Sequence, residues 1–314
     1  MARAGQGQSR VRLLAAAAAF WAVLTVGILV GWELGNGKHS ACDEQTKSLG
    51  GSVEKGSAVG EPQARGRGVV LSTYFTSKPD FQRKAYVASD TFAYIQPLYD
   101  SAIEQGVDLV LFHDGLSQAS LAEWSNERVS FVSVALRATI AMNDERFLFY
   151  DEFLAEHSEY DYVLMADVSD VELLGDPFRY VRADNVSPVE LGCQLWISEE
   201  KSTGKAAQWL FGHPDPCYNQ PRNFVNKNID LRRRLYNAGA IAGTRENVQR
   251  LLRLIAREFA RMDHHEANCN MAVLQYVIQK HYNVEDVCDT GMCWKDLCGH
   301  GDTVIAHKRG ETSA

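Results

Sequence analysis

The sequence lacks an excess of positive charge. It has 32 Lys and Arg against 40 Asp and Glu, which gives its 314 residues a formal net charge of −8. Binding along a phosphate backbone needs a basic surface, so this balance argues against a general nucleic-acid binder, although not against a small local basic site. The chain also has no internal repeat. Its length and its 46% hydrophobic content fit one large domain or two medium ones.

Residues 13–32 carry no formal charge. An apolar run of about 20 residues is long enough to span the hydrocarbon core of a bilayer. Arginines within residues 1–12 precede it, and the positive-inside rule then keeps this tail in the cytosol. We expect a transmembrane signal anchor over residues 13–34, with the rest of the chain in the lumen. A cleaved signal peptide is the alternative, but its apolar region is normally shorter.

Residues 35–67 have almost no large apolar side chains and are rich in Gly, Ser and charge. Such a segment buries too little surface to offset the entropy lost on ordering, so we predict a flexible stem. The folded luminal domain would then comprise residues 68–314.

No two cysteines have the C-x2-C spacing of a zinc ribbon. Cysteine usage fits a non-cytosolic compartment, and an even number in the folded part allows all of them to pair, although sequence does not choose the pairs. The spacing of Cys288, Cys293 and Cys298 predicts a loop near the C-terminus that is held by a disulfide. Cys42, in the stem, is a candidate for a disulfide that links two chains into a homodimer. The cysteines of the folded part are Cys193, Cys217, Cys269, Cys288, Cys293 and Cys298.

Short apolar runs that end in polar residues alternate with helical stretches along the first half of the folded part. This alternation predicts an α/β fold with a mostly parallel sheet flanked by helices. In such sheets, ligands bind at the carboxyl ends of the strands. Those ends carry Tyr74, His113 with Asp114, and Asp167 with Asp170. The expected strands are 68–75, 107–114, 129–134 and 160–167, and the expected helices are about 84–104 and 143–157, with Asn143 as a cap.

The second half of the sequence is less regular. We expect strands over residues 188–197 and 236–243, and a short strand or loop over 303–310. Thr244 can cap a helix that begins at residue 245, and residues 264–282 predict a further helix. Arg232, Arg233 and Arg234 form a basic run, which is usually a solvated face but could attract an anionic donor.

The strand 160–167 runs straight into Asp167 and Asp170. Mn²⁺ and Mg²⁺ choose oxygen ligands and usually bind through one or two carboxylates plus a substrate diphosphate. Asp is also favoured in turns, so both residues could instead be turn caps. The motif alone leaves the two interpretations open.

Four segments, in this order, resemble nucleotide-sugar glycosyltransferases with the GT-A fold. Residues 146–154 resemble the helix beside the nucleotide pocket, and 160–178 resemble the Asp-x-Asp region. Residues 236–243 resemble the Asn-Ala-Gly turn that faces the donor sugar and the acceptor, and 305–308 resemble the C-terminal segment whose His completes metal coordination. The resemblance spans about residues 69–308. It implies a GT-A-like catalytic domain, and an anchor followed by a stem is the usual layout of Golgi glycosyltransferases.

By this resemblance, Asp170 and His307 ligate Mn²⁺ or Mg²⁺, and Asp167 contacts the ribose or is a second metal ligand. In the family the last Asp usually lies two residues after the first, whereas here it lies three after, with Ser169 between them. The division of roles among Asp167, Ser169 and Asp170 therefore stays open. The alternative for His307 is an ordinary surface histidine. Lys308 would neutralise the diphosphate leaving group.

The resemblance also suggests contacts to the donor or the acceptor. Small residues let the backbone approach a sugar closely, and an Asn can hydrogen-bond to its hydroxyls. An ordinary turn before a strand is the alternative for the Asn-Ala-Gly segment. The expected contact residues are Tyr74, Arg146, Asp167, Ser169, Asn237, Ala238, Gly239 and Lys308.

Glu266 and Asn270 are the catalytic candidates. If the enzyme inverts configuration, Glu266 is the candidate base, one helical turn from Asn270 on the same face. If it retains configuration, no dedicated base is required, and Asn270 would only position the sugar. The neighbouring His264 and His265 do not face one ligand together.

The resemblance thus implies a metal-dependent glycosyltransferase of the Golgi or ER membrane. It would move a sugar from a nucleotide-sugar donor to a glycan or protein acceptor. Two alternatives are a non-catalytic luminal sugar-binding or scaffold protein on a degenerate GT-A domain, and a metal-dependent phosphoester hydrolase. The sequence does not specify the sugar, the nucleotide, the acceptor or the stereochemistry.

Overall fold

The computed structural model describes residues 66–80, 84–182, 193–199, 227–261, 268–288, 292–294 and 303–307. All of them belong to the second of two compact units, Pro62–Ala314. The predicted tail 1–12, the anchor 13–34 and nearly all of the stem 35–67 lie outside the described residues, as do Cys42, Glu266 and Lys308. Among the helices that are described, none is both long enough and apolar enough to cross a bilayer.

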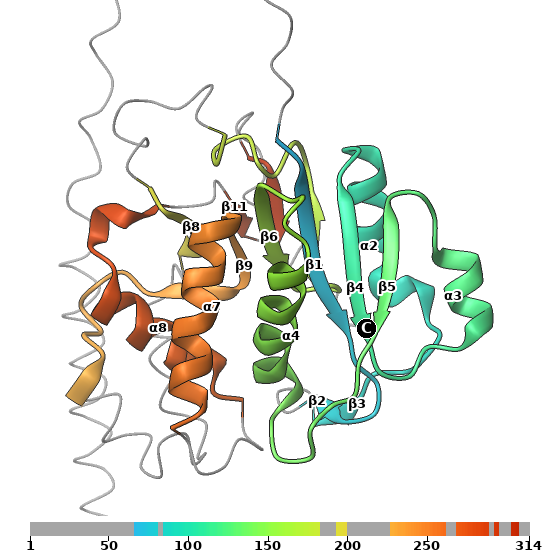
Figure 1. The fold of residues 1–314 in the computed structure, drawn as a ribbon, viewed down its shortest axis with the longest axis horizontal. Coiled ribbons are helices and arrows are strands. Elements are labelled where there is room, and N and C mark those ends of the chain that lie inside the picture. Colours follow the sequence, from blue (N-terminus) through green and yellow to red (C-terminus); the bar gives the residue numbers. More distant parts are fainter. Residues whose placement is uncertain are drawn as a thin grey trace, which may run out of the picture. The chain divides into compact units, whose positions relative to one another are not determined.

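A seven-stranded sheet forms the centre of the described part (Figure 1). Its strands are β1 (Gly68–Tyr74), β4 (Asp108–His113), β5 (Val129–Ser133), β6 (Tyr162–Ala166), β8 (Leu195–Glu199), β9 (Tyr236–Thr244) and β10 (Val287–Cys288). Their spatial order is β10-β8-β9-β6-β1-β4-β5. β6, β1, β4 and β5 are parallel to one another, and β8 and β10 are parallel to each other, whereas β9 is antiparallel to both β6 and β8.

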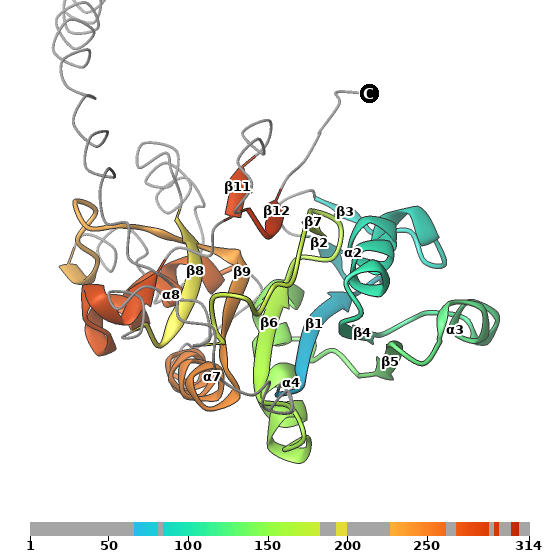
Figure 2. The same cartoon turned by 90° about the horizontal axis from the view of Figure 1, so that it is seen from above.

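Helices cover both faces of the sheet (Figure 2). α4 (Met142–Glu156), α7 (Arg245–Phe259) and α8 (Asn270–His281) pack on one face, and α2 (Phe92–Glu104) packs on the other. Side chains of a strand alternate between faces, so in β6 Val163 and Met165 join the α4–α7–α8 core, while Leu164 and Ala166 join the α2 core. The predicted α/β class with a mostly parallel sheet flanked by helices is confirmed.

The remaining elements are short. α3 (Gln118–Trp124) follows β4, and the 3-10 turn η4 (Val284–Asp286) precedes β10. A three-stranded sheet has the order β11-β12-β7, with β7 (Val171–Leu173), β11 (Met292–Trp294) and β12 (Ile305–His307). β2 (Pro79–Asp80) and β3 (Ala85–Tyr86) form a small hairpin.

Three predicted helix starts need correction. The helix expected from about residue 84 begins at Phe92, because the positive φ of Lys84 (53°) and Asp90 (55°) is incompatible with a continuous helix before it. Asn143 is not a cap: α4 begins at Met142, and Ala141 is its N-cap. α8 begins at Asn270 rather than at residue 264. Thr244 does cap α7, because its hydroxyl accepts from the Asn247 amide at 3.3 Å.

One disulfide joins Cys193, just before β8, to Cys288, at the end of β10. It links the outer two strands at one side of the sheet. The prediction that Cys288 forms a disulfide within the C-terminal loop is therefore wrong. Cys269 is disulfide-bonded as well.

Candidate metal centre

Two neighbouring antiparallel strands bring Asp167 next to the Asn-Ala-Gly segment. Ala166 at the end of β6 pairs with Ala240 of β9, and the Asp167 amide continues this pairing by donating to the Gly239 carbonyl at 2.8 Å. The Ser72 hydroxyl of β1 donates to the Ala166 carbonyl at 2.7 Å and fixes the strand end from its other side. Residues distant in sequence thus meet where β6 leaves the sheet.

The small sheet brings His307 to the same place. β7 begins directly after Asp170, and β12 pairs with it in antiparallel register, with His307 opposite Val171. His307 is fully buried. The alternative that it is an ordinary surface histidine is therefore wrong.

Asp167, Asp170 and His307 form a candidate metal site. One ligand atom of each residue can be chosen so that all three lie within 4.8 Å of one another. His307 Nε2 lies 3.8 Å from Asp167 Oδ2. The Ser169 hydroxyl donates to Asp170 Oδ1 at 2.7 Å, so in this structure Ser169 orients the neighbouring carboxylate. Two carboxylates and one imidazole at this spacing fit a single divalent cation.

Arg146 fixes Asp167 from the second turn of α4. Its Nη1 pairs with Asp167 Oδ1, and its Nη2 donates to the Ala238 carbonyl at 3.1 Å. Burial lowers the pKa of the Arg146 guanidinium, but the charge and hydrogen bond of Asp167, together with Tyr150 and Asp144, outweigh this effect and the net pKa is raised. Arg146 therefore stays charged and holds Oδ1, while Oδ2 faces His307.

Gly239 leaves the space that the cluster occupies. A Cβ atom at this position would lie 2.5 Å from His307 Cε1 and 2.8 Å from Asp167 Oδ2. Both separations are below ordinary contact distances. Glycine is required here because of this close approach, and its φ is not in the left-handed region.

Asn237, Ala238 and Asn270 adjoin the cluster but make local contacts. Asn237 Oδ1 accepts from the Gly239 amide at 2.7 Å, and the Ala238 amide donates to Met271 Sδ at 3.3 Å. Asn270 is buried, and its Nδ2 donates to the Asn143 carbonyl of α4 at 3.3 Å. These contacts hold the start of β9 against the start of α8.

Asp144 is a buried residue that the sequence did not single out. Its carboxylate accepts from the amides of Cys269 and Asn270, each at 2.8 Å, and so caps α8 from another helix. Burial raises the pKa of Asp144 to about 8, although the two amides and the charge of Arg146 favour the ionised form. An acid in the first turn of a helix is usually solvated, so no pattern in the sequence indicates this contact.

Tyr74 and Asp114, which end neighbouring strands, bind loops instead of meeting at a site. The Tyr74 hydroxyl donates to the Ala88 carbonyl at 2.6 Å and accepts from the Thr91 amide at 2.9 Å. Asp114 accepts from the Thr76 amide at 2.7 Å. In this structure their polar atoms stabilise the loops after β1 and before α2.

A mainly apolar pocket of about 280 Å³ opens beside the first turn of α4. Lys78 lies in its wall, where its ammonium donates to the Ile140 carbonyl at 2.6 Å and lies 3.6 Å from Glu145 Oε2. Asn143 lines the pocket as well as contacting Asn270. The pocket and the metal cluster are therefore connected through the first two turns of α4.

Comparison with known proteins adds no family assignment. No family model matches the chain, and no curated protein matches it. The likeness to GT-A glycosyltransferases rests on the four short segments alone.

Proposed function

We propose that the protein is a metal-dependent glycosyltransferase that moves a sugar from a nucleotide-sugar donor to a glycan or protein acceptor. The supporting observation is the meeting of Asp167, Asp170, Gly239 and His307. These residues come from three segments, each of which resembles a different part of the family's donor site. Turn caps and an ordinary turn would not require such a meeting.

A divalent cation fits the donor set, with Asp167, Asp170 and His307 as its protein ligands. When bound, it would neutralise the charge that develops on the departing nucleoside diphosphate. Mn²⁺ suits this set better than Mg²⁺, because it accepts an imidazole beside carboxylates more readily.

The chain's own residues then have distinct tasks. Arg146 pairs with one oxygen of Asp167 and leaves the other facing His307. Gly239 lets the backbone approach the donor sugar. Asn237 and Asn270, whose neighbours Ala238 and Met271 are in contact, would position this sugar. The pocket beside α4 would receive the nucleoside, because its walls are mainly apolar with one ammonium.

Several residues complete the proposal from outside the described part of the chain. Lys308 would neutralise the diphosphate, and Glu266 would be the base if configuration is inverted. Residues 13–34 would anchor the domain in the Golgi or ER membrane, with the catalytic domain in the lumen.

Hydrolysis of a panel of nucleotide sugars by the purified full chain tests the proposal. We expect turnover of at least one donor, loss with EDTA and recovery with Mn²⁺. Asp170→Asn should lower the rate by about a hundredfold, since it removes a metal ligand. Glu127→Gln, which changes an exposed carboxylate outside the cluster, should have no effect.

Two results would contradict the proposal. Absence of both turnover and nucleoside-diphosphate binding would favour a non-catalytic protein. Metal-dependent cleavage of simple phosphoesters without release of sugar from any donor would favour a hydrolase.

A further inference from the structure

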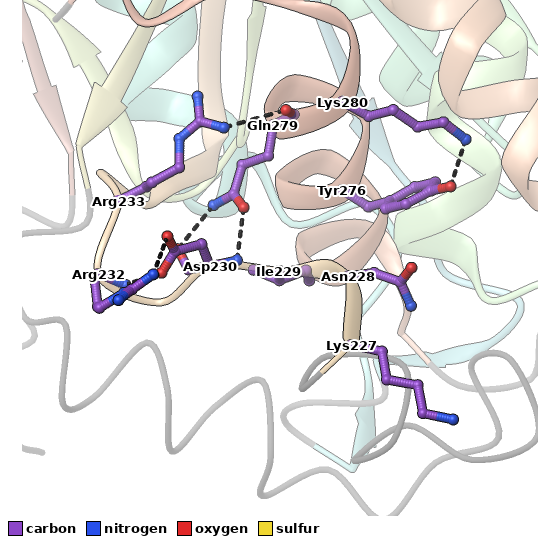
Figure 3. Close-up of a pocket in the computed structure, with 9 residues that line it drawn as sticks. All are labelled: Lys227, Asn228, Ile229, Asp230, Arg232, Arg233, Tyr276, Gln279 and Lys280. Carbon is purple, nitrogen blue, oxygen red and sulfur yellow. Dashed lines mark hydrogen bonds and ion pairs between the residues drawn. The ribbon is translucent and has the colours of Figure 1, made fainter.

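A second pocket, of about 670 Å³, lies at the C-terminal end of α8 and is open to solvent (Figure 3). Among the described residues, its lining includes Lys227, Arg232, Arg233 and Lys280 but only one carboxylate, Asp230. Four basic groups against one acid leave three positive charges in a chain whose formal net charge is −8. This contrast marks the pocket as a local anion-attracting site.

The two arginines are already engaged. Arg232 binds Asp230 with both ends of its fork, at 2.9 Å to Oδ1 and 3.0 Å to Oδ2. Arg233 Nη1 donates to the Gln279 carbonyl in the last turn of α8 at 3.2 Å. The first contact neutralises the charge of Arg232. The second gives a hydrogen-bond donor to a backbone carbonyl at the end of α8.

Lys227 and Lys280 remain without an ion pair to any described residue. Figure 3 shows them on the same side of the pocket, with Asn228 and Tyr276 between them, whereas Arg232 and Arg233 lie on the opposite side. The Lys280 ammonium contacts the Tyr276 hydroxyl and lies 4.6 Å from the centre of its ring. Two of the three net positive charges in the described lining therefore lie at one end of the pocket, and that of Arg233 lies at the other.

Two glutamines of α8 bind the backbone of the segment that precedes and begins β9. Gln279 accepts from the Asp230 amide at 2.8 Å and donates to its carbonyl at 3.1 Å. Gln275 does the same with Tyr236, at 3.0 Å and 2.6 Å. The segment before β9 is thus held along α8 as if it were a paired strand.

The same helix connects this pocket to the metal cluster. Met271, at the start of α8, contacts Ala238, and Lys280 lies at its end. At 1.5 Å per residue, these two positions are about 13 Å apart along the helix axis.

We propose that Lys227 and Lys280 bind the sulfate or carboxylate group of an acidic saccharide acceptor. The pocket volume falls within the range of small-ligand sites, about 300–1,000 Å³. Asn228 and Tyr276 line the pocket between the two lysines. Identification of the ligand as the acceptor rests on the proposed transferase function, whereas anion binding does not.

Calorimetric titration of the full chain with four probes tests the proposal: a sulfated uronic-acid disaccharide, a neutral disaccharide, inorganic sulfate and a poly-glutamate peptide. We expect the sulfated disaccharide to bind, and 0.5 M NaCl to weaken it because exposed charges are screened. Lys227→Gln with Lys280→Gln should weaken binding at least tenfold. The matched control, Lys84→Gln with Arg257→Gln, removes the same charge from two exposed positions and should leave binding unchanged.

Four results would overturn the proposal: equal binding of the neutral disaccharide, equal affinity of the double variant, inorganic sulfate binding as tightly as the saccharide, or tighter binding of a poly-glutamate peptide. If the transferase proposal holds, the double variant keeps donor hydrolysis and raises the KM for the acidic acceptor at least tenfold. If the wild-type chain turns over no donor, the transferase proposal fails, while the disaccharide titration still decides the binding proposal.

Discussion

At the scale of single residues, the candidate site depends on the absence of a side chain at Gly239 as well as on the side chains of its ligands. Gly239 has no side chain, and the space that a Cβ would take is filled by His307 and Asp167. Arg146 then holds one oxygen of Asp167, so that the other faces His307. A ligand set built this way tolerates little displacement, because its residues already lie at contact distance.

Gly239→Ala should therefore weaken Mn²⁺ binding by about ten- to a hundredfold, as loss of supporting contacts does in other metal sites. The added Cβ would push His307 or Asp167 out of place. Electron paramagnetic resonance of bound Mn²⁺ measures the affinity directly. Gly175→Ala is the matched control, since its Cβ would lie 3.6 Å from Val304, an ordinary contact. Equal Mn²⁺ affinity in both variants would contradict the assignment of the site.

At the scale of elements, the apolar strands of the first half were predictable, whereas β7 was not predicted and β12 was expected only as a short strand or loop. β6 is a buried run that ends in polar residues, so both the strand and the location of Asp167 at its end follow from the pattern. β7 and β12 have three residues each, too few to show a period, although their pairing brings His307 to the site. The candidate ligands were named from motif resemblance, but the pairing that unites them was not predicted.

The antiparallel insertion of β9 was also unpredicted. Its small residues, including Gly239 and Gly243, give no indication of strand direction, which is set by packing between β6 and β8. The start of α8 was placed too early because its cap comes from Asp144 on another helix. Local sequence carries no signal for a cap supplied across the core.

The contact between α4 and α8 should make stability depend on pH through Asp144. Burial raises the pKa of Asp144 from 3.8 to about 8, so between these values the folded chain holds a proton that the unfolded chain releases. Its contribution to the free energy of unfolding is full below about pH 4 and is lost as pH rises toward 8, by at most about 1.4 kcal/mol per unit. Asp144→Asn cannot ionise and should lack this slope.

Urea unfolding of the full chain between pH 5 and pH 9 measures this slope. The free energy of unfolding of the wild-type chain minus that of Asp144→Asn should fall as pH rises and level off above about pH 8. Glu127→Gln, at an exposed position, should run parallel to the wild type. Parallel curves for Asp144→Asn would mean that the two backbone donors keep Asp144 ionised throughout.

At the scale of the described domain, contacts between distant segments hold the site together. α4 supplies Arg146, β6 leads to Asp167, β9 carries Gly239, and β12 ends in His307. Pairing of β6 with β9 and of β7 with β12 brings Gly239 and His307 to Asp167 from distant parts of the chain. Their arrangement is a property of the sheet, so anything that loosens the sheet should weaken the site.

The Cys193–Cys288 disulfide is the covalent bond that joins the outer strands of this sheet. It closes a loop of 95 residues, and cross-links over such loops typically stabilise a fold by about 2–4 kcal/mol, mainly by restricting the unfolded chain. Cys193→Ser with Cys288→Ser should lower the free energy of unfolding of the full chain by this amount in urea titrations. Cys42→Ser lies outside the folded unit and should leave it unchanged. A double variant as stable as the wild type would show that β10 is held to β8 by packing and hydrogen bonds alone.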